Sequence, residues 1–294
     1  MVRASEAAGP LVIIGGAEDQ NGEARILREF LRLAGGVSSR VLVITVASEA
    51  QMEVGQHYSE IFNRLGAEEV RALAINKRGE ANSRAAVEAV ERATGVFFTG
   101  GNQLRITRLL GGTKLDTLLH KRNEKGLVLA GTSAGAAMMS TVMVIGGRPE
   151  PAFRISIAEL SPGMGFIEGV LIDQHFEERG RLRRLLLAVA HYPHEIGLGV
   201  DENTAVIARD QMLEVIGHGS VTIIDAGEMS YTNLASINKD DILTLCGIKI
   251  HILAEGNRFD LRNRTPLIES DSQEIEKTKE TKSAENRRRA IFED

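Results

Sequence analysis

The first half of the chain alternates between short apolar runs and segments with a helical period. Apolar runs rich in β-branched residues are typical of buried strands, whereas apolar residues three and four apart predict one face of a helix. Strands that alternate with helices of about 10 to 15 residues predict an α/β fold, a mostly parallel sheet with helices on both faces. The predicted strands are 10–16, 40–47, 70–75, 95–101 and 127–130, and the predicted helices are 22–35, 54–65, 83–93, 103–110 and 114–125.

The pattern changes after residue 197, where short strands of alternating polarity replace the strand–helix units. Such strands predict antiparallel hairpins, here expected to complete one edge of the sheet. We expect one α/β domain over 1–267 and a charge-rich tail, 268–294, that is exposed or disordered. The predicted elements of this half are an irregular loop at 148–165, a strand at 170–175, a helix at 182–190, and hairpin strands at 204–208, 212–216, 221–225 and 248–253.

One strand runs directly into a cluster of small residues around a serine. The apolar run 127–130 is followed by Gly131-Thr132-Ser133-Ala134-Gly135 and then by good helix formers. A strand, a tight turn and a helix with Ser at the tip form the layout of a nucleophile elbow. Close packing of a helix on a sheet is the alternative explanation for the small residues. The stretch 127–147 is too rich in Gly, Ser and Thr to predict a membrane span.

Composition limits the possible functions. The 294 residues carry a formal net charge of −5 and 26% charged residues, which argues against a nucleic-acid-binding protein. The one cysteine, Cys246, allows no intrachain disulfide, and residues 1–10 have no apolar core of signal-peptide length. We therefore expect a cytoplasmic protein that does not bind a membrane. The glycine-rich strand ends match neither the dinucleotide nor the phosphate-loop pattern, so we expect no cofactor, and we expect no metal.

A serine nucleophile needs a base and an acid that orients the base. Among the seven histidines, His175 is the strongest candidate, because it lies at the carboxyl end of a predicted strand, on the same edge of the sheet as the elbow. Glu202 is the first choice for the acid, since it follows another short strand. Glu150 is the second choice, and Asp201 and Asp173 are further possibilities. For each of these carboxylates the alternative role is to cap backbone amides.

Two further features complete the candidate site. The backbone amides of Ala134, directly after the serine, and of Gly101, in a Gly pair at a strand end, are candidates for an oxyanion hole. Four arginines, Arg179, Arg181, Arg183 and Arg184, follow His175 closely. Arginine at a helix amino end is unfavourable unless it faces an anion, so the cluster indicates a carboxylate site. A solvated charged face balanced by neighbouring glutamates is the alternative.

Four spaced motifs together resemble the cyanophycinase family, serine peptidases that include aspartyl dipeptidase. The motifs are Gly-Gly-Asn-Gln-Leu at 100–104, Gly-Thr-Ser-Ala-Gly-Ala at 131–136, Asp-Gln-His-Phe at 173–176 with Arg179, Arg181 and Arg184, and Val-Asp-Glu-Asn-Thr-Ala at 200–205. The resemblance covers about 10–267. The segment 148–165 departs from the family, in which it is richer in polar and basic residues, and this departure leaves the exact substrate preference open but not the hydrolytic mechanism.

The resemblance implies a homodimer with a fold like that of class I glutamine amidotransferases. It implies an exopeptidase that releases β-Asp-Arg from cyanophycin, a poly-aspartate with arginine on each β-carboxyl, or else an aspartyl or isoaspartyl dipeptidase. Ser133 would be the nucleophile, His175 the base and Glu202 the orienting acid. The residues implied to line the substrate pocket are Gln103, Asp173, Gln174, Arg179, Arg181 and Arg184. A non-enzymatic nucleotide or metabolite binder that uses the glycine-rich loops to bind phosphate is the competing class of function.

Overall fold

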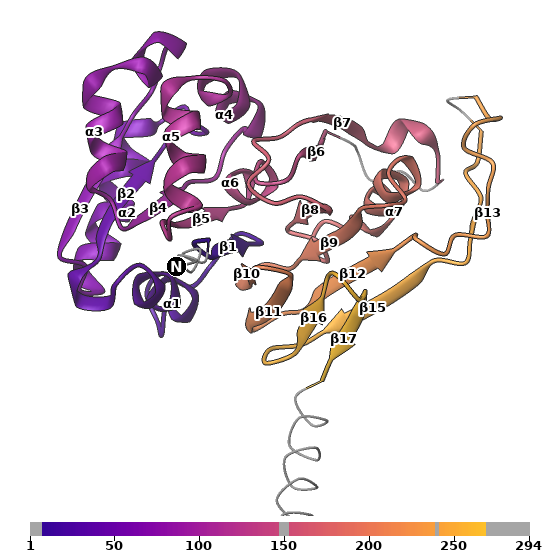
Figure 1. Ribbon diagram of the computed structural model, residues 1–294. Helices are drawn as coiled ribbons and strands as arrows, with labels where there is room; N and C mark the ends of the chain where they lie inside the picture. The colour runs from indigo at the N-terminus through magenta and orange to yellow at the C-terminus, as the bar shows by residue number, and fades with distance from the viewer. Residues whose placement is uncertain (1–7, 147–152, 239–240, 269–294) are drawn as a thin grey trace, which may run out of the picture.

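The computed structural model describes residues 8–146, 153–238 and 241–268. Over these residues the largest sheet has nine strands in the order β17-β16-β11-β10-β1-β5-β4-β2-β3 (Figure 1). From β1 to β3 all neighbours are parallel, and from β1 to β17 all neighbours are antiparallel. The strands are β1 (Leu11–Ile14), β2 (Arg40–Ile44), β3 (Glu69–Leu73), β4 (Gly95–Phe98), β5 (Val128–Thr132), β10 (Thr204–Arg209), β11 (Met212–Gly217), β16 (Arg258–Asp260) and β17 (Thr265–Leu267).

Helices cover both faces of the parallel part of this sheet, as the sequence predicted. Alternate residues of β1 point to opposite faces, with Leu11 and Ile13 in one hydrophobic cluster and Val12 and Ile14 in another. The first cluster includes α3 (Arg84–Arg92), α4 (Gln103–Leu110), α5 (Lys114–Asn123) and α6 (Ala134–Ala137), and the second includes α1 (Arg25–Leu33) and α2 (Gln51–Arg64). Ser83 caps α3, since its side chain accepts a hydrogen bond from the Ala86 amide.

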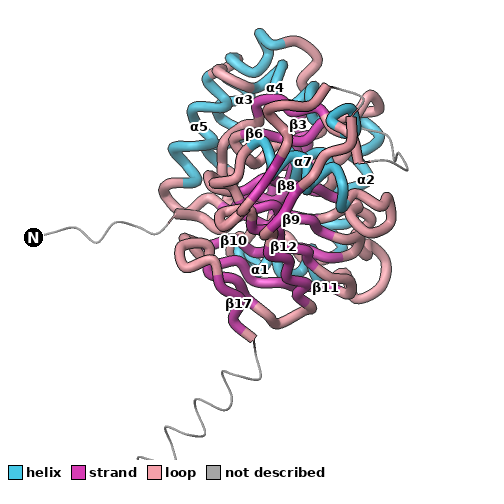
Figure 2. The backbone as a smooth tube through the Cα atoms, turned by 90° about the vertical axis from the view of Figure 1, so that its right-hand side faces the viewer, coloured by secondary structure: helices cyan, strands magenta, loops and turns pink. Residues whose placement is uncertain are grey.

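A second sheet of four strands in the described residues lies beside the antiparallel end of the large one, and it faces the viewer in Figure 2. Its order is β15-β12-β9-β8, with β8 and β9 parallel. The helix α7 (Leu182–His191) connects β8 to β9 and packs on the outer face of this sheet. The strands are β8 (Val170–Gln174), β9 (Ile196–Val200), β12 (Val221–Asp225) and β15 (Lys249–Leu253).

The prediction that all the late strands extend the large sheet was wrong for two of them. The strands at 204–208 and 212–216 do extend the large sheet, but those at 221–225 and 248–253 pair with each other in the second sheet. Apolar periodicity identifies a strand but not its neighbour, so it could not separate the two sheets.

The segment 148–165 is also more regular than predicted. Its described part contains the short helix η3 (Ile155–Ile157) and the strand β7 (Glu159–Pro162), which pairs with β6 (Val142–Ile145). The other elements are the short helices η1 (Gly36–Ser38) and η2 (Arg78–Asn82) and the paired strands β13 (Tyr231–Thr232) and β14 (Leu245–Cys246). Of the predicted tail, residues 269–294 lie outside the described part of the chain.

Candidate active site

Ser133 lies in a sharp turn between β5 and α6. Its backbone has φ 54° and ψ −113°, a conformation that costs free energy for a residue with a side chain. The glycines on either side are required sterically: a Cβ on Gly131 would lie 2.1 Å from the Gly135 carbonyl oxygen, and one on Gly135 would lie 2.4 Å from the Phe98 carbonyl oxygen. The chain therefore holds the serine in a strained, fixed position, as in a nucleophile elbow.

His175 lies between Ser133 and Glu202. Its Nε2 is 2.8 Å from Ser133 Oγ, and its Nδ1 is 2.5 Å from Glu202 Oε1. The histidine is buried and has a positive φ of 49°, whereas the Glu202 side chain is 35% exposed. This is the contact pattern of a serine, a base and an orienting carboxylate, in the chain order Ser, His, Glu.

The other proposed acids are placed differently. Asp201 Oδ2 accepts hydrogen bonds from the Ser220 amide and hydroxyl, at 3.0 and 2.7 Å, and its Oδ1 accepts one from the Glu177 amide. It therefore caps backbone groups, which was the alternative explanation for a carboxylate at a strand end. Glu150 lies outside the described residues.

The end of β1 connects the three elements that carry these side chains. Three consecutive carbonyl groups, of Ile14, Gly15 and Gly16, accept hydrogen bonds from the amides of Ser133 (3.0 Å), His175 (2.8 Å) and Asn203 (2.8 Å), respectively. This crowding excludes side chains, because a Cβ on Gly16 would lie 2.3 Å from the His175 ring and one on Gly15 would lie 2.0 Å from the Asp201 carbonyl oxygen. The segment 14–16 thus sets the relative positions of the elbow, β8 and the turn after β9.

A buried carboxylate behind the elbow was missed by the sequence analysis. Glu18 is 4% exposed and accepts hydrogen bonds from the hydroxyls of Tyr58 (2.6 Å) and Thr132 (2.5 Å). Burial and the negative charge of Glu18 raise the pKa of Tyr58, so its hydroxyl remains a donor. Glu18 thereby restrains Thr132, the residue before the nucleophile. An acid two residues after a glycine pair was the only sequence signal, and it is not specific.

The backbone amides of the two proposed oxyanion donors are unpaired in the described residues. Gly100 packs against the nucleophile, since a Cβ on it would lie 3.5 Å from Ser133 Cβ. Gly101, with φ 140°, could not carry a side chain, because a Cβ there would lie 2.2 Å from the Ala47 carbonyl oxygen. In the part of the chain that the structure describes, the amides of Gly101 and Ala134 donate to no other protein group.

Most of the proposed substrate-binding side chains contact one another. The Asp173 side chain is fully buried, and Arg184 binds both of its oxygens, with 2.6 Å from Nε to Oδ2. Arg181 contacts Asp173 at 3.3 Å and donates to Gln174 Oε1 at 2.8 Å. Both oxygens of Asp173 are therefore bound within the protein, and neither is available to a substrate guanidinium.

Arg179 and Gln103 lie differently. Arg179 is exposed and close enough to Arg181 that its positive charge acts on the pKa of that guanidinium. Burial lowers the pKa of Arg181 to about 10. The negative charge of Asp173 opposes this shift, whereas the positive charges of Arg184 and Arg179 add to it. Arg181 stays charged at neutral pH, and its repulsion by the Arg179 guanidinium favours an anion between the two side chains. Gln103 is half-buried and donates to the Val144 carbonyl oxygen at 3.1 Å.

Two other kinds of site have no support in the described residues. No group of three or more His, Cys, Asp or Glu side chains in the described ranges is placed to hold a metal ion. None of the described helices is long and apolar enough to cross a membrane.

Comparison with known proteins points to the same family as the sequence motifs. The model of the family described as Peptidase family S51 matches residues 11–216. The cyanophycinase of Geminocystis herdmanii (strain PCC 6308) is 38% identical over 259 residues, which are 87% of this chain and 95% of that protein. The cyanophycinase of Nostoc sp. (strain PCC 7120) is 40% identical over 259 residues, 87% of each chain.

A solved structure supports the fold. The crystal structure of a peptidase from an acI-B1 Actinobacterium superposes with a TM-score of 0.68 at 22% identity, over 88% of this chain and 100% of that one. At that identity the likeness concerns the arrangement of the elements and not the substrate.

Proposed function

Because this chain belongs to peptidase family S51, we propose that it is a serine exopeptidase that hydrolyses cyanophycin to the dipeptide β-Asp-Arg. The observation that carries the proposal is the contact of His175 with both Ser133 Oγ and Glu202, at 2.8 and 2.5 Å, in a strained turn at the end of a parallel strand. Curated cyanophycinases that match 87% of the chain support the choice of polymer.

The contacts described above support a role for each proposed catalytic residue. Ser133 Oγ attacks the scissile carbonyl carbon while His175 Nε2 takes the hydroxyl proton, and Glu202 stabilises the resulting imidazolium through Nδ1. The amides of Ala134 and Gly101 would stabilise the negative oxygen of the tetrahedral intermediate. His175 then protonates the leaving amine, which leaves an acyl-enzyme on Ser133. A water molecule, deprotonated by His175, hydrolyses that ester and restores the serine.

The arginines after His175 support the proposed recognition of this substrate. Each cyanophycin unit offers a free carboxylate, which matches the forked donors of a guanidinium. Arg179 and Arg181 would bind this carboxylate, and Gln103 and Gln174 would offer amide groups beside it. Asp173 and Arg184 would support the pocket from beneath, since their charges are already paired.

The assembly and location are also proposals. Resemblance to the family supports a homodimer, and the single, exposed Cys246 is compatible with a reducing compartment such as the cytoplasm. Light scattering on the purified protein tests the first, and a single subunit mass would contradict it.

The test of function is digestion of cyanophycin by the purified protein, with the product identified by mass spectrometry. We expect β-Asp-Arg, and we expect no product from Ser133→Ala. Undiminished release by Ser133→Ala would disprove the mechanism. Faster hydrolysis of free aspartyl or isoaspartyl dipeptides than of the polymer would instead favour the dipeptidase alternative.

A further inference from the structure

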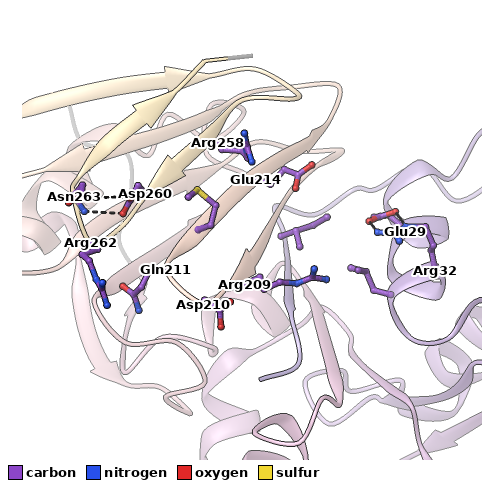
Figure 3. A pocket seen from close by; sticks show the side chains of 13 residues that line it. Glu29, Arg32, Arg209, Asp210, Gln211, Glu214, Arg258, Asp260, Arg262 and Asn263 are labelled. Atoms are coloured by element: carbon purple, nitrogen blue, oxygen red, sulfur yellow. Dashed lines mark hydrogen bonds and ion pairs between the residues drawn. The ribbon is translucent and has the colours of Figure 1, made fainter. Parts of the chain in front are cut away.

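A second pocket lies at the other end of β10 from the catalytic residues. Thr204, at the start of the strand, follows the turn that holds Glu202, whereas Arg209, at its end, lines the pocket. Five residue steps at about 3.3 Å separate the two ends by about 17 Å. The pocket has a volume of about 550 Å³, within the range of ligand sites in proteins. Figure 3 shows it between α1 on one side and the strands β10, β11 and β16 on the other.

Strand register produces an ordered pattern of charge in this pocket. Ile207, Glu214 and Arg258 are cross-strand partners on β10, β11 and β16, and Arg209, Met212 and Asp260 form the next such row. Partners in register, and residues two apart on one strand, point to the same face. Positive and negative side chains therefore alternate across one sheet face, and Arg32 of α1 closes it from the side.

The side chains of three arginines of this pocket form no hydrogen bond or ion pair among the described residues, although the charge of Arg262 acts on the nearby Asp260 carboxylate. Arg209, Arg258 and Arg262 are exposed, and their side chains make no hydrogen bond or ion pair with any residue in the described ranges. A pocket of about 730 Å³ nearby differs in this respect, because its Arg264 pairs with Asp225 and its Lys249 pairs with Glu228. The pocket at the end of β10 thus retains guanidinium groups whose paired N–H donors can bind the carboxylates of a ligand.

The charge pattern selects the class of ligand. Arg32, Arg209, Arg258 and Arg262 are matched in number by Glu29, Asp210, Glu214 and Asp260, so the lining has no net charge. A nucleic acid would be repelled by the four carboxylates, and a metal cation by the four guanidinium groups. A ligand that carries carboxylates and guanidinium groups at short intervals can pair with both the guanidinium groups and the carboxylates of the pocket.

We propose that this pocket is a second binding site for the polymer, which holds a stretch of cyanophycin remote from the bond being cleaved. The choice of ligand rests on the proposed function, because each unit of that polymer carries one free carboxylate and one guanidinium group. An exopeptidase acts on one chain end, so a remote site would keep the polymer bound between successive cleavages and raise its effective concentration.

The second binding site should affect binding of long substrates but not of short ones. An extended chain spans at most about 3.6 Å per residue, so an oligomer of two units covers about 7 Å and cannot reach from the catalytic serine to the pocket. The polymer can reach both. Loss of the pocket should therefore weaken binding of the polymer and leave cleavage of the short oligomer unchanged.

The test combines Arg209→Ala, Arg258→Ala and Arg262→Ala in one variant. Its matched control combines Arg28→Ala, Arg71→Ala and Arg84→Ala, which removes the same charge from exposed arginines elsewhere. Binding is measured by co-sedimentation with insoluble cyanophycin in the Ser133→Ala background. Cleavage of the polymer and of the two-unit oligomer is measured with Ser133 intact. A thermal melt of each variant verifies that it is folded.

We expect the pocket variant to bind the polymer about tenfold more weakly and to show a KM for the polymer raised by a similar factor, since each exposed ionic contact contributes modestly. Its kcat and its cleavage of the oligomer should match those of the control. Equal polymer binding by the two variants would overturn the proposal. If neither polymer nor oligomer is cleaved by the unmodified enzyme, the proposed function fails, and the sedimentation result still decides for or against the pocket.

Discussion

At the two ends of β10, charged side chains are held in opposite ways. At the catalytic end Asp173 and Arg184 form a buried ion pair and Glu18 is buried between two hydroxyls, although Arg179 is exposed. At the other end Arg209 and Arg258 are exposed and have no ion pair among the described residues. Buried charges must be paired because desolvation is costly, and the pairing fixes their geometry. Exposed charges carry no such constraint and can exchange water for a ligand.

The largest effect is expected at the catalytic contact itself. Glu202→Gln keeps the shape of the side chain but removes the charge that stabilises the His175 imidazolium. We expect kcat for the polymer to fall about 10³- to 10⁴-fold, equivalent to about 4 to 5.5 kcal/mol. Glu150→Gln, measured in the same assay, should stay close to the unmodified enzyme. A larger fall in kcat for Glu150→Gln than for Glu202→Gln would identify Glu150 as the acid that orients His175.

The buried ion pair should dominate stability. Asp173→Asn leaves the guanidinium of Arg184 without a counter-charge in a buried site, so we expect the free energy of unfolding to fall by about 3 to 5 kcal/mol. Urea denaturation measures this loss. Asp173→Leu combined with Arg184→Met should recover much of it, because an apolar pair needs no desolvation. Unchanged stability of Asp173→Asn would show that the pair contributes little.

The carboxylate behind the elbow should have an intermediate effect. Glu18→Gln replaces one acceptor oxygen by a donor and cannot accept from both Tyr58 and Thr132. The cost of an unsatisfied buried group is about 1 to 3 kcal/mol, so we expect kcat to fall about 10- to 100-fold with KM unchanged. Tyr58→Phe, which leaves the Thr132 contact intact, serves as the comparison and should lose less. Equal kcat for Glu18→Gln and the unmodified enzyme would exclude this positioning role.

The smallest effect on stability is expected at the far end of the strand. Single substitutions Arg209→Ala, Arg258→Ala and Arg262→Ala should change the free energy of unfolding by no more than about 0.5 kcal/mol each, because these side chains are exposed. Urea denaturation beside Arg184→Ala provides the direct contrast. A loss of several kcal/mol at Arg209 would mean that the two ends of β10 do not differ as described.

Local patterns predicted the part of the molecule whose structure depends on local chemistry. The alternation of strands and helices from β1 to β5, with helices on both faces, is confirmed. Ser133 was identified because only small neighbours permit the turn, and the structure shows those glycines against backbone oxygens. His175 and Glu202 were selected because strand ends in such folds meet at one edge.

Long-range pairing was not predictable in the same way. The second sheet depends on which strands become neighbours, and a strand pattern carries no label for its partner. The contact between Glu18 and Thr132 joins residues 114 positions apart, and neither residue alone indicates it. Asp173 was expected to face the substrate, yet burial beside Arg184 gives both of its oxygens to the protein.

The sequence by itself determined the order of the elements, the strained turn at Ser133 and the types of side chain at the strand ends, because backbone sterics and apolar periodicity act over a few residues. Only the tertiary structure decided that Glu202, rather than Asp201, contacts His175, and that one group of arginines is paired while another has no ion pair among the described residues. Those outcomes depend on burial and on distances between remote segments, which are set by the packing of the two sheets.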